Sequence, residues 1–292
     1  MTDTSDARSR PPTMITVVKL GGELLETHDL LRRLADTMAT MSSSQPLVVV
    51  HGGGREINRE LELRGVASRT VDGLRITDAT TLQVVVSVLA GLVNTRLVAA
   101  MAAAGARSVG LTGADDGLVT VEPAPPHRRS DGTLVDLELV GQPIDRGRPR
   151  LLEDLLHRGY VPVIASIGMM PNGRLLNVNA DTLAAHIARR VGASRLLIAG
   201  ATAGVLDASG ATIDHLAARS IQGRIASGEV HGGMAAKLTA CLDALDGGVA
   251  EVLVVDGRTA DGLTTLRGTR IEHGAGHFGG SPSEATAARS DA

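Results

Sequence analysis

The sequence predicts an α/β fold in which a mainly parallel sheet is covered by helices on both faces. Short β-branched runs alternate with segments of helical period along the 292 residues, a pattern typical of βαβ units. Two of these runs, Ile15–Val18 and Leu47–Val50, lead into glycine-rich turns. Hydrophobic residues make up 43% of the chain and charged residues 21%, which is typical of a soluble globular protein with a large apolar core. Length alone leaves open one large unit or two coupled lobes.

The first half of the chain carries three predicted strands and three predicted helices. Its strands are short Val-, Ile- and Leu-rich runs, and its helices repeat apolar residues every three or four positions. Strands are expected at 15–19, 47–51 and 107–111, and helices near 28–42, at 54–65 and, as one long helix, at 78–104. Between Gly117 and Asp145 proline, glycine and charged residues multiply, which indicates β-hairpins on the edge of the sheet.

The second half repeats the alternation. Helices are expected at 149–158, 180–191, near 215–226 and at 233–246, with strands at 161–165, 195–199, 251–255 and around 268–272. A soft boundary near Gly192 divides the chain into an N-terminal lobe, 14–191, and a C-terminal lobe, 192–273. Segments 1–13 and 274–292 are polar or rich in Gly, Ser and Ala, so both are predicted to be disordered.

Composition excludes several classes of protein. A net charge of −3 argues against a nucleic-acid groove, which needs a basic excess. The single cysteine, Cys241, excludes an internal disulfide and a cysteine zinc cluster, fits a reducing cytoplasm, and is predicted to be a buried helix residue. The start of the chain has no apolar signal region, and no apolar run is expected to span a bilayer. We therefore expect a cytoplasmic protein without a membrane or nucleic-acid partner.

The two glycine-rich strand ends predict an anion site. Lys19 precedes Gly21-Gly22, and His51 precedes 52–54, where three glycines follow one another. Backbone without Cβ atoms lets amide groups approach an anion closely, and a following helix adds the positive end of its dipole. A strand-end lysine is usually a solvated charge, but within a glycine turn it can neutralise a transferring phosphoryl group. The Walker pattern is absent, and His51 is interpreted as a hydrogen-bonded strand-end residue rather than a base.

Two further polar segments each precede a predicted helix. Arg75 lies between the anion-prone loops and is interpreted as a fork for a substrate carboxylate, with a plain surface charge as the alternative. Asp78 is expected to cap the long helix, with Thr77 as the fallback. In the stretch 177–182, an N-cap and a dipole-favoured acid explain Asn179 and Asp181 but leave Asn177 free to donate to a carboxylate.

A second lysine follows another glycine pair. Gly232-Gly233 opens a helix whose first turns contain Lys237, where the helix dipole disfavours a cation. An anionic partner accounts for that placement. A lysine from each lobe gives two cations for one transition state, with Asp181 able to orient both.

Taken in order, these motifs resemble the acetylglutamate kinases of the amino acid kinase superfamily. The resemblance covers about 14–272 and rests on segments 19–22, 51–54, 72–77, 89–94, 162–168, 177–181 and 232–237. It implies an open three-layer αβα sandwich. It also implies ATP-dependent phosphorylation of the side-chain carboxylate of N-acetyl-L-glutamate, the second step of arginine biosynthesis.

The resemblance assigns roles by position. Lys19 and Lys237 would stabilise the in-line transition state, with Asp181 organising both. Acetylglutamate would be bound by Gly53, Gly54, Arg75, Asn177 and Asn179, with Arg75 on the α-carboxylate. The nucleotide would be bound by Gly21, Gly22, Ala201, Gly204, Val205, Leu206, Gly232, Gly233 and Met234. Mg²⁺ would be held mainly by phosphates, without a metal ligand from the protein. No general base is needed, because the acceptor is already a carboxylate.

The chain departs from the family pattern in two places. Where the family usually has Ser/Thr-Asp-Val-x-Gly, this chain reads Gly-Ala-Thr-Ala-Gly over 200–204, so an acid near the nucleotide is missing. Around 113–117 the usual lysine before a single Asp-Gly is also missing. Two alternatives therefore stay open: a kinase of the same fold for a related or carrier-bound acyl amino acid, and a degenerate ligand-binding regulatory member.

The resemblance also bears on assembly. Arginine-inhibited members carry an N-terminal helix that links dimers into a hexamer, and the segment before Met14 is short and polar. We therefore expect a homodimer.

Overall fold

The computed structural model describes residues 14–129 and 131–273, so the predictions for 1–13 and 274–292 lie outside the described residues. Its main sheet has eight strands in the order β14-β16-β15-β13-β1-β2-β10-β5. The central strands are parallel, and β16 runs antiparallel to β15. The strands are β1 Thr16–Leu20, β2 Leu47–His51, β5 Ser108–Leu111, β10 Val161–Ala165, β13 Arg195–Gly200, β14 His215–Ala217, β15 Glu251–Asp256 and β16 Gly268–Glu272.

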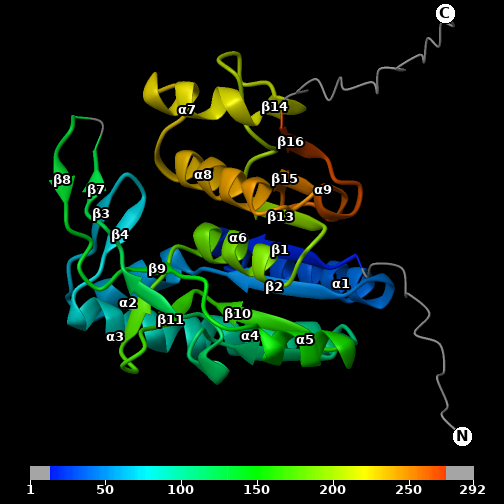
Figure 1. Ribbon diagram of the computed structural model, residues 1–292. Helices are drawn as coiled ribbons and strands as arrows, with labels where there is room; N and C mark the ends of the chain where they lie inside the picture. Colours follow the sequence, from blue (N-terminus) through cyan, green and yellow to red (C-terminus); the bar gives the residue numbers. More distant parts are fainter. Residues whose placement is uncertain (1–13, 130, 274–292) are drawn as a thin grey trace, which may run out of the picture.

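Helices cover both faces of this sheet, as the sequence predicts (Figure 1). Each face has its own buried apolar cluster, because alternate strand residues point to opposite sides. One face packs against α1 His28–Ser44, α2 Gly54–Leu63, α3 Ala79–Val86, α4 Asn94–Ala103 and α9 Ala260–Thr264. The other packs against α5 Arg150–His157, α6 Ala180–Arg190, α7 Ala218–Ala226 and α8 Gly232–Asp246. The three-layer αβα architecture is confirmed.

The alternation within β1 directs a charged side chain into one of these clusters. Val17 belongs to the α6 and α8 side, whereas Val18 and Leu20 belong to the α1 side. Lys19 therefore faces α6 and α8, and only 5% of the residue is exposed. Its partners must come from those two helices.

The predicted long helix is present but contains a π-helical turn, η2 Ser87–Val93, between α3 and α4. Asp78 caps it, accepting a hydrogen bond from the Thr81 amide at 2.7 Å. The expectation that no apolar run could span a bilayer is wrong by length and composition, because 79–103 is apolar enough over 25 residues. An 18-residue window of it is 44% buried, and it packs on the sheet as a core helix.

The irregular segments differ from the prediction in two respects. The hairpins between 117 and 145 form separate two-stranded ladders rather than an extension of the main sheet. In these ladders β6 Val121–Pro123 pairs with β9 Gly141–Pro143, and β7 His127–Arg128 pairs with β8 Leu134–Val135. Leu137 and Val140 of this segment pack with Val71 in a third cluster, whereas Val121 of β6 belongs to the cluster on the α6 and α8 face. The predicted helix 215–226 begins as strand β14. Two further strand pairs form small sheets: β3 Arg69–Val71 with β4 Leu74–Ile76, and β11 Ile167–Met169 with β12 Leu175–Asn177.

Candidate active site

Two lysines meet one carboxylate between the sheet and two helices. Lys19 Nζ lies 2.9 Å from Asp181 Oδ1, and Lys237 Nζ lies 3.6 Å from Asp181 Oδ2. The lysine and aspartate side chains of the closer pair are 6% and 7% exposed, and that of Lys237 is 18% exposed. Lys19 comes from β1, Asp181 from the first turn of α6 and Lys237 from α8, which packs on α6. The structure thus brings together the three predicted catalytic residues.

The charge state of this cluster follows from its pairing. Burial by itself raises the pKa of Asp181, but the two lysines outweigh it and hold that pKa below its usual range. The backbone at the start of α6 is fixed by Asn179, whose Oδ1 accepts hydrogen bonds from the amides of Asp181 at 2.8 Å and Thr182 at 3.1 Å. Asp181 is therefore a fixed anion that holds two cations at the end of β1.

The two glycine-rich loops are in contact with each other. A Cβ on Gly22 would lie 2.8 Å from Gly53 Cα and 2.9 Å from Gly54 N, closer than real Cβ atoms come. A Cβ on Gly53 would lie 2.8 Å from Leu89 Cδ2 in the long helix. Glycine at position 22 is therefore required for the loops to sit side by side, and glycine at position 53 leaves room for the Leu89 side chain. Two sets of backbone amides can then face one space at the ends of β1 and β2.

His51 is a hydrogen-bonded strand-end residue, as the sequence predicts. Its side chain is completely buried, with Nδ1 3.1 Å from its neighbour's carbonyl oxygen, Gly52 O. Asn94 Nδ2 lies 3.0 Å from His51 Nε2 and donates to Val163 O at 2.9 Å. Since the carbonyl requires a donor, His51 carries its proton on Nδ1 and accepts from Asn94. Holding the Gly52 carbonyl on the ring turns the amide N–H of Gly53 in the opposite direction, because the peptide is planar and trans.

Buried neutral histidines give the fold a predictable pH dependence. Burial lowers the pKa of His51 to about 4. Burial also lowers the pKa of His186 to about 4, where Asp145 raises it and Arg190 and Arg189 lower it further. The unfolded chain binds these protons near pH 6.5, whereas the folded chain does not, so stability falls as pH drops from 6.5 towards 4. At pH 5 we expect a loss of about 2 kcal/mol of unfolding free energy per histidine.

Urea unfolding at pH 7 and pH 5 measures this loss. His51→Gln should lose part of the pH slope, whereas His28→Gln, at a side chain 90% exposed, should keep the wild-type slope. Identical slopes in all three proteins would contradict the assignment of His51 as a neutral buried group.

The Arg75 guanidinium is held in place by neutral hydrogen-bond acceptors. It donates to Asn58 Oδ1 at 2.6 Å, Ser68 Oγ at 2.8 Å and Gly54 O at 3.1 Å. In the described part of the chain it has no carboxylate partner. Burial lowers the pKa of Arg75 from its ordinary value, and the charge remains because that value is so high. The group is thus held against the second glycine loop with its charge uncompensated.

Asn177 reaches the same region from β12. Its Nδ2 donates to Thr77 Oγ1 at 3.0 Å, and that hydroxyl donates to Arg75 O at 3.2 Å. Asn177 and Arg75 therefore lie in one hydrogen-bonded network although they are far apart in sequence. Asn179 has a capping oxygen that is already used by α6, which leaves its amide nitrogen for a ligand.

Apart from Gly21 and Gly22 in the first glycine loop, the residues expected to bind nucleotide lie at the start of α8 and in the loop after β13. Gly204 has φ 146°, and Val205 N donates to Thr269 Oγ1 at 2.7 Å, which ties the loop to β16. A Cβ on Gly73 would lie 3.3 Å from Gly233 N, so the tip of the β3–β4 hairpin touches the start of α8. The remaining members of the set lie in these same two segments: Ala201, Leu206, Gly232 and Met234.

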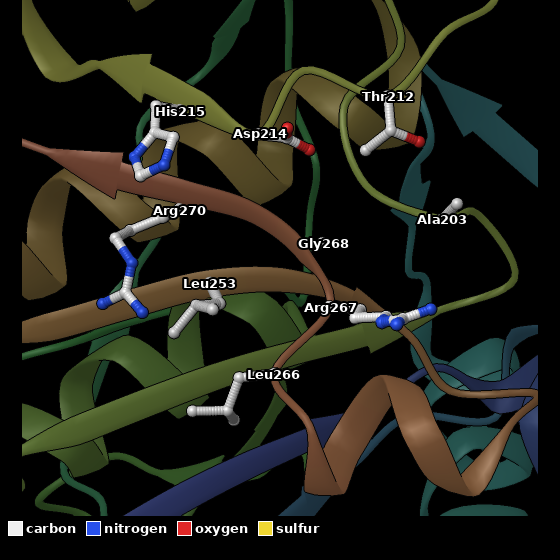
Figure 2. Close-up of a pocket in the computed structure, with 9 residues that line it drawn as sticks. All are labelled: Ala203, Thr212, Asp214, His215, Leu253, Leu266, Arg267, Gly268 and Arg270. Atoms are coloured by element: carbon white, nitrogen blue, oxygen red, sulfur yellow. The ribbon is translucent and has the colours of Figure 1, made fainter.

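A pocket of about 540 Å³ lies elsewhere in the C-terminal half. Figure 2 shows it between the loop that carries Ala203 and Thr212 and the strand that carries Gly268 and Arg270. Its wall includes Leu253, whose side chain points to the α1 face of the sheet. None of the three residues of the lysine–aspartate cluster lines it. We therefore place the candidate active site at the cluster and the glycine loops rather than in this pocket.

Sequence reasoning gave no role to Asn94 and overlooked a compositional signal. Asn94 is 5% exposed within an apolar helix, and a polar residue at a buried helical position is itself a signal of a specific partner. Lysine and arginine together number 29, yet only Lys19 and Lys237 are lysines. Both contact Asp181. The scarcity of lysine marks the two positions at which a compact ammonium, rather than a guanidinium, is retained.

Comparison with known proteins identifies the family of this chain. The pattern of the amino acid kinase family matches residues 14–256. An acetylglutamate kinase of Rhizorhabdus wittichii is 39% identical over 260 residues, 87% of this chain and 86% of that protein. An acetylglutamate kinase of Methanopyrus kandleri is 40% identical over 261 residues, 87% of this chain and 99% of that protein.

Solved structures share the architecture. An N-acetylglutamate synthase of Neisseria gonorrhoeae, complexed with coenzyme A and N-acetyl-glutamate, has a TM-score of 0.74 and 25% identity over 88% of this chain and 59% of that chain. A carbamate kinase of Giardia lamblia has a TM-score of 0.62 over 89% of this chain and 98% of that chain, at 13% identity, which shows the fold alone. Because the family pattern and the relatives each span most of the sequence, this chain belongs to the amino acid kinase family, among its acetylglutamate kinases.

Proposed function

We propose that this protein transfers the γ-phosphoryl group of ATP to the side-chain carboxylate of N-acetyl-L-glutamate, the second step of arginine biosynthesis. The observation that carries the proposal is the pair of lysines held by one buried aspartate beside two glycine loops. Phosphoryl transfer spreads negative charge over the equatorial oxygens and needs positioning and cations more than covalent chemistry. A carboxylate acceptor requires no general base, and the cluster offers none: Asp181 is held ionised between its lysines.

The two halves of the chain take different parts in this scheme. The N-terminal lobe, 14–191, binds acetylglutamate: Arg75 takes its α-carboxylate, and Asn177 with the amides of Gly53 and Gly54 holds the rest. The C-terminal lobe, 192–273, binds ATP through the loop after β13 and the start of α8. The free positive charge of Arg75 and the contact of Gly73 with Gly233 support this division.

The donor set at the cluster fits a polyanionic nucleotide. Two ammonium groups, the backbone amides of Gly21 and Gly22 and the N-terminus of α8 all favour phosphate oxygens. Mg²⁺ would be bound mainly through phosphates, because this ion usually keeps several waters and takes only one or two protein carboxylates beside the phosphates of its substrate. When bound, the ion neutralises phosphate charge. Lys19 and Lys237 then act on the oxygens of the group in transfer.

We further propose a cytoplasmic homodimer formed through the long helix. Its exposed residues between Gln83 and Ala102 are uncharged, and Leu92 is 55% exposed. Arg96, the charged residue of this stretch, is partly exposed and pairs with Glu56. An uncharged helix face of this kind suits a self-complementary, twofold interface. Light scattering on the purified protein, compared with the chain mass of 30.1 kDa, measures the assembly.

The test of the function is ADP formation from Mg·ATP with N-acetyl-L-glutamate and, in parallel, with free L-glutamate. Hydroxylamine is present to trap the acyl phosphate as a hydroxamate. We expect turnover with the acetylated substrate and a matching amount of hydroxamate. Turnover only with a carrier-bound or longer acyl amino acid would support the same-fold alternative. Acetylglutamate binding without turnover on any acceptor would support a regulatory binding protein.

A further inference from the structure

A carboxylate outside the lysine–aspartate cluster lies beside it, at the ends of β1 and β13. Glu23 follows the first glycine loop and folds back over it: a Cβ on Gly21 would lie 2.4 Å from Glu23 Oε1 and 2.5 Å from Oε2. A Cβ on Gly200, at the end of β13, would lie 3.5 Å from the same Oε1. The carboxylate therefore lies where two glycines, distant in sequence, leave space.

The chain holds this carboxylate in place through its neighbours. Glu23 belongs to the short turn η1 Gly22–Leu24, closed by the Leu24 amide donating to Gly21 O at 3.1 Å. Leu24 and Leu25 are 0% and 1% exposed, so the turn is anchored in the apolar cluster of the α1 face. Gly21 in turn donates its amide to Ala199 O at 3.0 Å, which ties the loop to β13. Glu23 is thus the half-buried member of an otherwise buried turn.

The charge of Glu23 is not balanced by a direct partner. Over 14–129 and 131–273 it has no hydrogen bond and no ion pair, whereas Glu26, in the next turn, pairs with Arg55. Lys237 Cε lies 3.6 Å from the position of a Cβ on Gly200, so Lys237 and Glu23 border the same space. With two lysines, Asp181 and Glu23, the formal charge around that space is zero. A triphosphate entering it would meet a free carboxylate, which repels it unless a divalent cation lies between them.

We propose that Glu23 is the protein's oxygen ligand for the divalent cation that accompanies the nucleotide, directly or through a metal-bound water. This assignment rests on the proposed function, because it takes the space beside Lys237 as the phosphate site. Magnesium sites of nucleotide enzymes combine substrate phosphates with one or two carboxylates and several waters. Glu23 supplies such a carboxylate at the point where the two lysines supply only positive charge. Glu23 therefore makes the affinity for the nucleotide depend on the presence of the divalent cation.

The test measures coupling between metal and nucleotide at equilibrium, without turnover. ATP binding is followed by calorimetry in excess Mg²⁺ and in EDTA, and Mn²⁺ binding to the protein–ADP complex by electron paramagnetic resonance. For Glu23→Gln we expect tighter ATP binding in EDTA than in the wild type, and Mn²⁺ affinity in the ADP complex lower by roughly tenfold to a hundredfold. Acetylglutamate affinity should not change.

Matched variants separate this role from general effects of charge. Glu26→Gln removes a carboxylate three residues away and should leave the coupling at its wild-type value. Glu23→Asp keeps the charge on a shorter side chain and should retain coupling, at a level between wild type and Glu23→Gln. Equal coupling in wild type and Glu23→Gln would overturn the proposal. Metal-coupled ATP binding in a wild-type protein that does not phosphorylate acetylglutamate would leave the Glu23 assignment standing and overturn the proposed function instead.

Discussion

Replacing Lys19 with alanine is expected to lower kcat by roughly a hundredfold or more, because an ammonium aimed at developing charge acts mainly on the transition state. Lys237→Ala should have a comparable effect on rate. The two variants should differ in stability. Lys19 is the closer partner of Asp181, at 2.9 Å against 3.6 Å for Lys237, and removing one partner of a buried ion pair costs about 3–5 kcal/mol. Lys237→Ala should cost less, since Asp181 keeps its closer cation.

Steady-state kinetics, calorimetry with acetylglutamate and urea unfolding separate these effects. Acetylglutamate affinity should change little in either variant, because neither lysine contacts Arg75 or its network. Arg64→Ala is a matched removal of a cation from an exposed ion pair with Glu60 and should leave rate and stability near their wild-type values. Parallel losses of acetylglutamate affinity and turnover would mean that the lysines bind the ground state instead.

Gly22→Ala is expected to lower kcat/KM by roughly a hundredfold, because it separates the two glycine loops. The new Cβ would meet the backbone of Gly53 and Gly54 at 2.8 and 2.9 Å, where no side-chain rotation can relieve the contact. One loop or both must shift, so the phosphate-binding and carboxylate-binding amides would no longer face each other at the distance that transfer needs. The cost in unfolding free energy should be about 1–3 kcal/mol, as for other overpacked interiors.

Gly223→Ala is the control for this change. Gly223 lies in α7, and a Cβ there would meet nothing within 4 Å. Alanine at that position should leave kcat/KM unchanged and raise helix stability by up to about 1 kcal/mol. A Gly22→Ala enzyme with wild-type kinetics would show that the spacing of the loops does not determine the rate.

Local sequence patterns predicted the elements that carry the candidate site. Alternating strand and helix periods placed β1, β2, α6 and α8, and capping chemistry identified Asp78 and Asn179, because both depend on neighbouring residues. Local patterns were not enough to predict that Lys19 and Lys237 lie close together. The rule that parallel strands bring their carboxyl ends to one edge placed Lys19 beside the glycine loops, and the resemblance of the ordered motifs added Lys237, which lies on α8.

Other features depend on packing that the sequence does not display. The pairing of His51 with Asn94 requires the register of the long helix on the sheet, which the π-helical turn sets. The β3–β4 hairpin was missed although its turn, Asp72-Gly73, has φ 47° and 82°, the type I′ geometry that Asp-Gly favours. The position of the Glu23 carboxylate could not be predicted from the sequence, because it depends on Gly200, in a strand almost 180 residues away.

The two lysines also determine how this protein responds to amine-directed chemistry. They are its only side-chain primary amines, and both lie against Asp181. Succinimidyl dyes, pyridoxal phosphate with borohydride, and resins that couple through lysine therefore have no side chain to attack outside this cluster. Lys237, at 18% exposure against 6% for Lys19, is the more accessible of the two. Conjugation of this protein should consequently be directed to carboxylates or to an added tag, because on the function proposed above we expect a label on either lysine to inhibit it.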